Sequence, residues 1–227
     1  NEVGKRPRSR AQMLVSPKHD PEFIRETVKS KGFVGLKPYH LFSSHNPTPD
    51  SRIEDFLPES HVRIAHEEGL TITLHMVRRR ALADPVNQIT IRHYAESYPD
   101  MRLILAHAAR GFNPHHTIEG IESLTGLTNV YFDTCAVSDP GANEAIIKTM
   151  GHQALLFASD FPCTHQRARA VGVGDTFQWI YAKHVQGRDG AIVKGSVDGL
   201  TMLAFESLRA LKIAAISLKL SDSQIED

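Results

Sequence analysis

Short runs rich in Val, Ile, Leu and Phe recur along the chain, and the segments between them carry apolar residues at helical spacing. Such runs are typical of strands buried on both faces. The predicted strands are residues 12–16, 33–38, 71–76, 102–107, 129–134 and 154–160. The predicted helices are residues 21–31, 60–68, 87–98, 116–124, 143–150 and a last amphipathic one at about 200–216. This alternation predicts an α/β fold of parallel strands joined by helical crossovers.

Capping residues support several of these helices. Asp20-Pro21 and Asp84-Pro85 each place an N-cap residue before a proline at the first helical position. Gly32 and Gly69 stand just beyond two predicted helix ends, where a left-handed residue is preferred.

Either a barrel or a doubly wound sheet could be built from this alternation. Neither a GxGxxG nor a GxxxxGK[ST] loop follows any predicted strand, which argues against the nucleotide-binding open sheets. The long proline-containing loop 41–58 is ordinary for the catalytic face of a barrel. We therefore predict a single barrel-type domain over residues 1–227.

Polar residues end four of the predicted strands. His75, His107, Asp160 and Lys37 hold these positions. The carboxyl ends of barrel strands open onto one face, so these side chains are expected to converge. A single strand-end histidine is often a packing residue, and an aspartate before Phe-Pro can be explained by turn chemistry. Together, however, two imidazoles and a carboxylate suit a divalent first-row metal, most often zinc.

The same runs carry a resemblance to a known family. Residues 32–38, 72–75, 103–108, 129–134 and 156–162 resemble strands four to eight of the amidohydrolase superfamily. The most similar branch is the amidohydrolase 2 group, which includes hydrolases, lactonases, decarboxylases and hydratases. The resemblance implies a (β/α)8 TIM-barrel fold, with residues 12–17 as strand three and the first two strands missing from this chain.

The resemblance also implies roles for the strand-end residues. His75 matches the strand-five metal ligand. His107 matches the strand-six histidine, which binds a metal or orients water and the substrate carbonyl. Asp160 matches the strand-eight aspartate, which is both ligand and general base. The implied mechanism is activation of water by a divalent metal, zinc or else manganese or another first-row ion, with His107 stabilising the developing oxyanion.

One departure from the family pattern leaves the metal site incomplete. The family's strand-one His-x-His pair supplies two ligands, and this sequence contains no His-x-His. We expect the missing strands in an upstream segment or a partner chain. The alternative is a degenerate relative that no longer binds metal.

Three cations are candidates for binding substrate. Arg78 and Arg110 follow the strand-end histidines and could clamp a carboxylate in bidentate fashion. In binuclear relatives a carbamylated lysine occupies the position of Lys37, although here pairing with a carboxylate or a substrate acid group is favoured. Asp133 could hydrogen-bond a ligand histidine or merely end its strand, and Cys135 is expected to be an inert buried thiol.

Composition narrows the range of partners. The 26 basic and 26 acidic side chains give a formal net charge of zero. The chain therefore has no excess positive charge that would favour nucleic-acid binding. Neither an apolar run of ~18 residues nor a signal-peptide core is present, so we expect no membrane association. The two distant cysteines fit a reducing cytoplasm. A homo-oligomer is compatible with the family.

The leading interpretation is a metal-dependent hydrolase of a small, carboxylated organic acid, lactone or amide. One alternative keeps the metal and changes the reaction to nonoxidative decarboxylation or hydration. The other is a noncatalytic barrel domain that has lost its metal.

Overall fold

All six predicted strands are present in the structure, a computed structural model that describes residues 6, 8–182 and 199–226. They are β1 (Gln12–Val15), β2 (Gly35–Pro38), β3 (Thr71–Leu74), β4 (Arg102–Leu105), β5 (Val130–Asp133) and β6 (Leu155–Leu156). The helices are α1 (Pro21–Lys31), α2 (Glu59–Glu67), α3 (Pro85–Ser97), α5 (Pro114–Gly120), α6 (Pro140–Met150), α7 (Leu203–Ser217) and α8 (Asp222–Glu226). Short 3-10 turns are η2 (His40–Phe42), η3 (Thr48–Asp50), η4 (Ile53–Asp55), η5 (Ala81–Ala83), η6 (Ile121–Leu124), η7 (His152–Ala154) and η8 (Cys163–His165).

The strand order decides between the two architectures left open by the sequence. The six strands form one sheet in the order β1-β2-β3-β4-β5-β6, and the pairs β1–β2, β2–β3, β3–β4 and β5–β6 are parallel. A doubly wound sheet reverses its strand order at a switch point, whereas a barrel is wound in one direction. The sequential order is therefore that of a (β/α) barrel. Within the described residues the sheet is not closed, and β1 and β6 are its edges.

The chain divides into two compact units. The first comprises the chain up to Arg79, together with Asp84–Leu105 and Gly126–Tyr131. The second comprises Arg80–Ala83, Ala106–Thr125 and the chain from Phe132 onward. Each is described below by itself.

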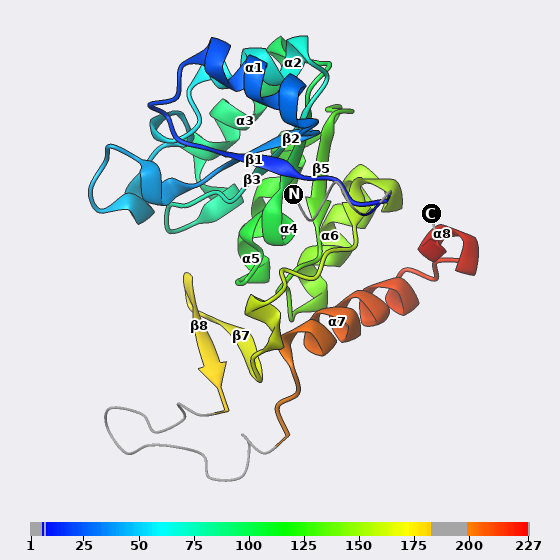
Figure 1. Ribbon diagram of the computed structural model, residues 1–227. Coiled ribbons are helices and arrows are strands. Elements are labelled where there is room, and N and C mark those ends of the chain that lie inside the picture. Colours follow the sequence, from blue (N-terminus) through cyan, green and yellow to red (C-terminus); the bar gives the residue numbers. More distant parts are fainter. Residues whose placement is uncertain (1–5, 7, 183–198, 227) are drawn as a thin grey trace. The chain divides into compact units, whose positions relative to one another are not determined.

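Helices α1 and α2 pack side by side in the first unit (Figure 1). The Asp20 carboxylate accepts the N–H groups of Glu22 and Phe23 at the start of α1, and Gly32 ends the helix with a φ of 68°. The capping prediction is thus confirmed there. A side chain that satisfies orphan N–H groups fixes where a helix begins. The register that follows buries Ile24 and Val28 completely or nearly so.

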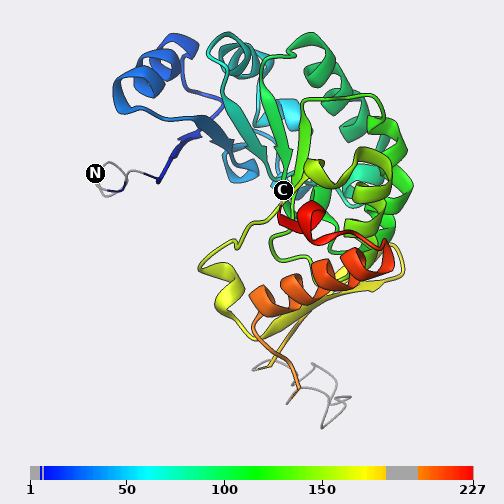
Figure 2. The same cartoon turned by 90° about the vertical axis from the view of Figure 1, so that its right-hand side faces the viewer.

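A β-hairpin that the sequence analysis did not predict belongs to the second unit. It pairs β7 (Ala168–Val173) with β8 (Thr176–Tyr181) in antiparallel fashion, and Gly174 in its turn has a φ of 53°. Phe112 packs against Phe177 and Trp179 of this hairpin. Helix α7 lies along β7 (Figure 2). No helix in the parts of the chain described here is long and apolar enough to cross a membrane.

Candidate functional site

The segment after β4 forms an unusual left-handed turn that carries His107. The φ angles of His107, Ala108, Ala109 and Arg110 are 60°, 49°, 59° and 59°. This turn is labelled α4 (Ala106–Arg110) in Figure 1. Each non-glycine residue in this region costs roughly 1–2 kcal/mol relative to a right-handed conformation. Surrounding contacts must therefore hold the turn in place, and strained turns of this kind cluster at functional sites.

His107 is buried, and both its backbone and its ring are held by β5 and the residues after it. Its backbone N–H donates to Asp133 Oδ1 at 2.8 Å, and its Nδ1 lies 3.0 Å from the carbonyl oxygen of Cys135. The Cys135 Sγ lies 3.2 Å from the same nitrogen. A carbonyl only accepts hydrogen bonds, so the contact with the carbonyl favours the tautomer with the proton on Nδ1. The neutral ring then has its lone pair on Nε2, which is the arrangement of a ligand histidine with an outer-shell partner.

Asp133 organises this cluster through one oxygen. Oδ1 accepts the backbone N–H of His107, the backbone N–H of Cys135 at 3.2 Å and the Cys135 thiol at 2.7 Å. From the sequence alone, Asp133 could be either a hydrogen-bond partner of a ligand histidine or a simple strand end. In the structure it binds the backbone of His107, while the Cys135 carbonyl binds the His107 ring.

His107, Asp133 and Cys135 also bring three potential metal-ligand atoms within 4.8 Å of one another. In a tetrahedral zinc site with bonds of about 2.0–2.3 Å, a sulfur and an oxygen ligand lie roughly 3.5 Å apart. The Cys135 sulfur and Asp133 Oδ1 are 2.7 Å apart, closer than two ligands of one tetrahedral zinc ion. As arranged, the cluster orients His107 and is not a preformed metal site.

Burial raises the pKa of the Cys135 thiol well above its ordinary value, and the charge of Asp133 adds to the effect. The Asp160 carboxylate contributes in the same direction, which places it within electrostatic reach of Cys135. A protonated thiol is a poor nucleophile. Cys135 is therefore a hydrogen-bond donor in this site, and the exposed Cys163 is the more accessible thiol.

The raised pKa predicts how stability depends on pH. The unfolded thiol ionises near pH 8.5, whereas the native thiol stays protonated. The contribution of Cys135 to the free energy of unfolding is therefore complete below that pH and is lost as the pH rises above it. Relative to Cys135→Ala, the wild type should lose about 2 kcal/mol of unfolding free energy between pH 8.5 and pH 10. Urea unfolding at both pH values, in a Cys163→Ser background, measures this difference. Equal pH slopes for the two proteins would contradict the assignment.

Asp160 follows β6 at the carboxyl end of the sheet and is exposed. Its φ of 48° lies in the left-handed region, which aspartate tolerates better than most residues. The structure thus places Asp160 and the His107 cluster within one compact unit.

His75 directly follows β3 in the first unit and is half-buried. Its ring centroid lies 5.7 Å from that of His40 and 6.4 Å from that of Tyr39. His40 was not among the residues predicted from the sequence. The signal for it was its place two residues beyond the end of β2, beside the strand that leads to His75.

The three candidate substrate-binding cations have different surroundings. Lys37 lies on β2, half-buried and in register with Leu14 of β1. Arg78 donates from Nε to Asp84 Oδ2 at 2.7 Å and from Nη1 to the Asp50 carbonyl at 3.3 Å. Burial lowers the pKa of Arg110, and its guanidinium carbon lies 5.4 Å from the centre of the Phe177 ring, a cation–π contact.

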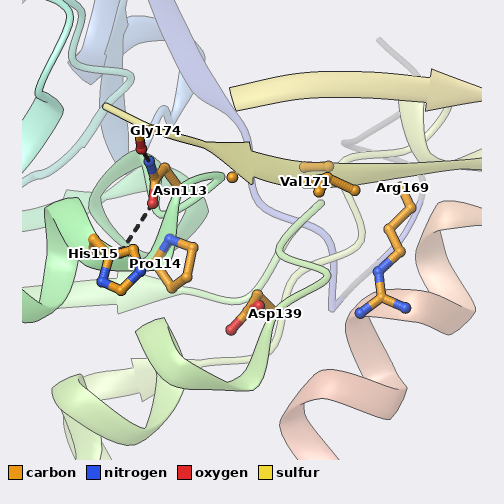
Figure 3. Close-up of a pocket in the computed structure, with 9 residues that line it drawn as sticks. Asn113, Pro114, His115, Asp139, Arg169, Val171 and Gly174 are labelled. Carbon is orange, nitrogen blue, oxygen red and sulfur yellow. Dashed lines mark hydrogen bonds between the residues drawn. The ribbon is translucent and has the colours of Figure 1, made fainter. Parts of the chain in front are cut away.

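A cavity of about 570 Å³ opens in the second unit (Figure 3). The Asn113 side chain braces it by accepting the His115 N–H and donating to the carbonyls of Gly174 and Thr176. Its lining includes opposite charges, Asp139 and Arg169. This volume is suitable for a small ligand. The full lining consists of Asn113, Pro114, His115, Asp139, Arg169, Ala170, Val171, Gly172 and Gly174.

Comparison with known proteins identifies the family. The family model described as amidohydrolase matches residues 2–180, well over half of the chain. The chain belongs to the amidohydrolase family. The family resemblance seen in the sequence is thereby confirmed, and with it the barrel-type fold. No curated protein sequence matches this amidohydrolase.

Two solved structures of one protein share the fold, with TM-scores above 0.5. An amidohydrolase from Burkholderia multivorans with bound Hepes is 15% identical, with a TM-score of 0.55 over 97% of this chain and 71% of its own. The same protein with bound zinc is 13% identical, with a TM-score of 0.56 over 99% of this chain and 72% of its own. The 5-carboxyvanillate decarboxylase from Sphingomonas paucimobilis is 16% identical, with a TM-score of 0.47, and the match spans 71% of this chain and 59% of that enzyme.

Proposed function

We propose that this amidohydrolase is a metal-dependent hydrolase of a small, carboxylated organic acid, lactone or amide. The observation that carries the proposal is the contact of 3.0 Å between His107 Nδ1 and the Cys135 carbonyl oxygen, which favours the tautomer with the proton on Nδ1. A neutral imidazole held in this way offers the Nε2 lone pair to a cation. A strained left-handed turn kept in place by Asp133 supports a functional role for this histidine.

The chemistry of the donor set fits a divalent cation. We infer that His75, His107 and Asp160 hold it, and two imidazoles with one carboxylate favour zinc over magnesium or calcium, with manganese as a further candidate. The Burkholderia multivorans relative was solved with zinc bound. When bound, such a cation lowers the pKa of water and polarises a carbonyl group.

We assign the proton transfer and the orientation of water to residues of the chain. Asp160, exposed beyond the end of β6, accepts the proton of the attacking water. His107 with its proton on Nδ1 can accept a hydrogen bond or bind metal through Nε2, but it cannot donate to an oxyanion from Nε2. The tautomer therefore favours a role for His107 in binding metal or orienting water. To stabilise an oxyanion from Nε2, the His107 ring would have to carry a proton on both nitrogens.

Arg110 is the cation that we favour for binding the substrate carboxylate, ahead of Lys37. The guanidinium of Arg78 is already engaged with Asp84 and Asp50. Arg110 is half-buried against Phe177, and an ion pair formed in such surroundings is stronger than one in water.

A substrate panel tests this proposal. Pairs of lactones and amides, each with a free carboxylate and as its methyl ester, should show hydrolysis of the carboxylated member. Arg110→Met should raise KM for that member roughly 10- to 100-fold and leave the ester unchanged, because one charge-assisted pair is lost. Arg102→Met, an exposed arginine on β4, is the control. Release of CO₂ as the main product, or the same KM change for acid and ester, would contradict the proposal.

A further inference from the structure

His40 and His75 come together at the carboxyl ends of two neighbouring strands in the first unit. Strands β2 and β3 are parallel and adjacent (Figure 1), with Leu36 paired to Ile72. His75 is the first residue after β3, and His40 is the second after β2. Parallel strands present their carboxyl ends at the same edge, so two imidazoles meet at the edge where barrel enzymes build their sites.

The distance between the two rings is close to that expected for two imidazoles bound to the same metal ion. Zinc–nitrogen bonds of about 2.0–2.1 Å in tetrahedral or slightly opened geometry put the centroids of two bound imidazoles roughly 5–6 Å apart. The centroids of His40 and His75 are 5.7 Å apart, with ring planes at 35°. The centroid distance is therefore compatible with two imidazoles bound to one cation.

The His40 ring is also held as ligand histidines are held. Its Nδ1 lies 3.2 Å from the Thr48 hydroxyl, and Tyr39 stacks on it with centroids 5.5 Å apart and planes at 19°. When the hydroxyl accepts from Nδ1–H, the lone pair of the His40 ring is on Nε2, as in ligand histidines with an outer-shell partner. Half-burial of both histidines limits competition from water.

We propose that His40 is a metal ligand of this chain and forms with His75 a two-imidazole site for a divalent transition metal. The proposal rests on His75 being a ligand, as in the proposed function, and adds His40 to the candidate ligands of a sequence that contains no His-x-His pair. It also gives a role to Tyr39 and Thr48, which contact the His40 ring beyond the end of β2.

Zinc affinity of the full chain tests the pair directly. His40→Phe keeps a ring for stacking on Tyr39 but removes the ligand nitrogen, and it should weaken zinc binding at least 10-fold, as should His75→Phe. Thr48→Val should cause a smaller loss. His45→Phe, at an exposed position in the same loop, should bind zinc as the wild type does. Competition with a chromophoric chelator gives the Kd, and melting of the metal-free variants checks folding.

A spectroscopic variant separates direct ligation from packing. His40→Cys loaded with cobalt(II) should gain a near-ultraviolet thiolate-to-cobalt absorption that the wild type and His45→Cys lack. Absence of that band, or wild-type zinc affinity in His40→Phe, would overturn the proposal even if hydrolysis is metal-dependent. Conversely, a zinc-binding pair in a chain that hydrolyses nothing would contradict the proposed function and leave this site intact.

Discussion

Replacing Asp160 with asparagine is expected to lower the turnover of a hydrolysed substrate by roughly 10²- to 10⁴-fold, the usual contribution of a general base. Asparagine keeps an oxygen that can bind a metal and tolerates the left-handed backbone found at this position, where φ is 48°. The substitution therefore removes the proton acceptor with little cost in fold. Initial rates at saturating substrate, with metal content measured in the same samples, give the result.

The matched control is Asp100→Asn, an exposed carboxylate on a loop of the first unit. It should leave turnover within about twofold of wild type, as expected of a surface change. Turnover of Asp160→Asn within tenfold of wild type, at equal metal content, would exclude Asp160 as the base.

Replacing Asp133 with alanine is expected to produce the largest loss of stability among single changes at the site, about 3–5 kcal/mol. Three donors lose their acceptor at once: the backbone N–H groups of His107 and Cys135, and the Cys135 thiol. All of them are buried, so water cannot replace the carboxylate without cost. The free energy of unfolding in urea, measured at pH 7, gives the effect.

Asp133→Asn distinguishes the hydrogen bonds from the charge. The amide oxygen can still accept, so this variant should retain more than half of the stability that alanine loses. Asp100→Ala again serves as the surface control. If Asp133→Ala unfolds within 1 kcal/mol of the wild type, the described cluster does not hold the turn after β4.

The parallel sheet could be predicted from the sequence because strands buried on both faces appear as short apolar runs. The runs that became β1 to β6 fall in the predicted places, although β6 covers only Leu155 and Leu156 of the run predicted over 154–160. The β7–β8 hairpin was missed. Its first strand has small buried residues, Ala168 and Ala170, and gives no apolar run. The alternating aromatic residues Phe177, Trp179 and Tyr181 of β8, after the Gly174-Asp175 turn, were the signal that could have found it.

The site was predictable only as a set of strand-end residues. In chain order His107 follows β4, Asp133 ends β5 and Asp160 follows β6. The carboxyl ends of barrel strands lie at one edge of the sheet, which is why these residues could be picked out. No local pattern shows that four non-glycine residues after β4 adopt left-handed conformations, so the approach of Cys135 to the His107 ring could not be foreseen. His40 was missed for a similar reason, because its pairing with His75 depends on the register of β2 and β3.

Metal dependence of hydrolysis is the most direct measurement of what this amidohydrolase does. The purified chain is stripped with a chelator, reloaded with zinc or manganese, and assayed for bound metal and for hydrolysis of the carboxylated substrate in the same samples. We predict about one ion per chain, loss of hydrolysis on stripping and its return on reloading. A chain that binds no transition metal, or that hydrolyses equally well without it, would contradict the proposal of a metal-dependent hydrolase.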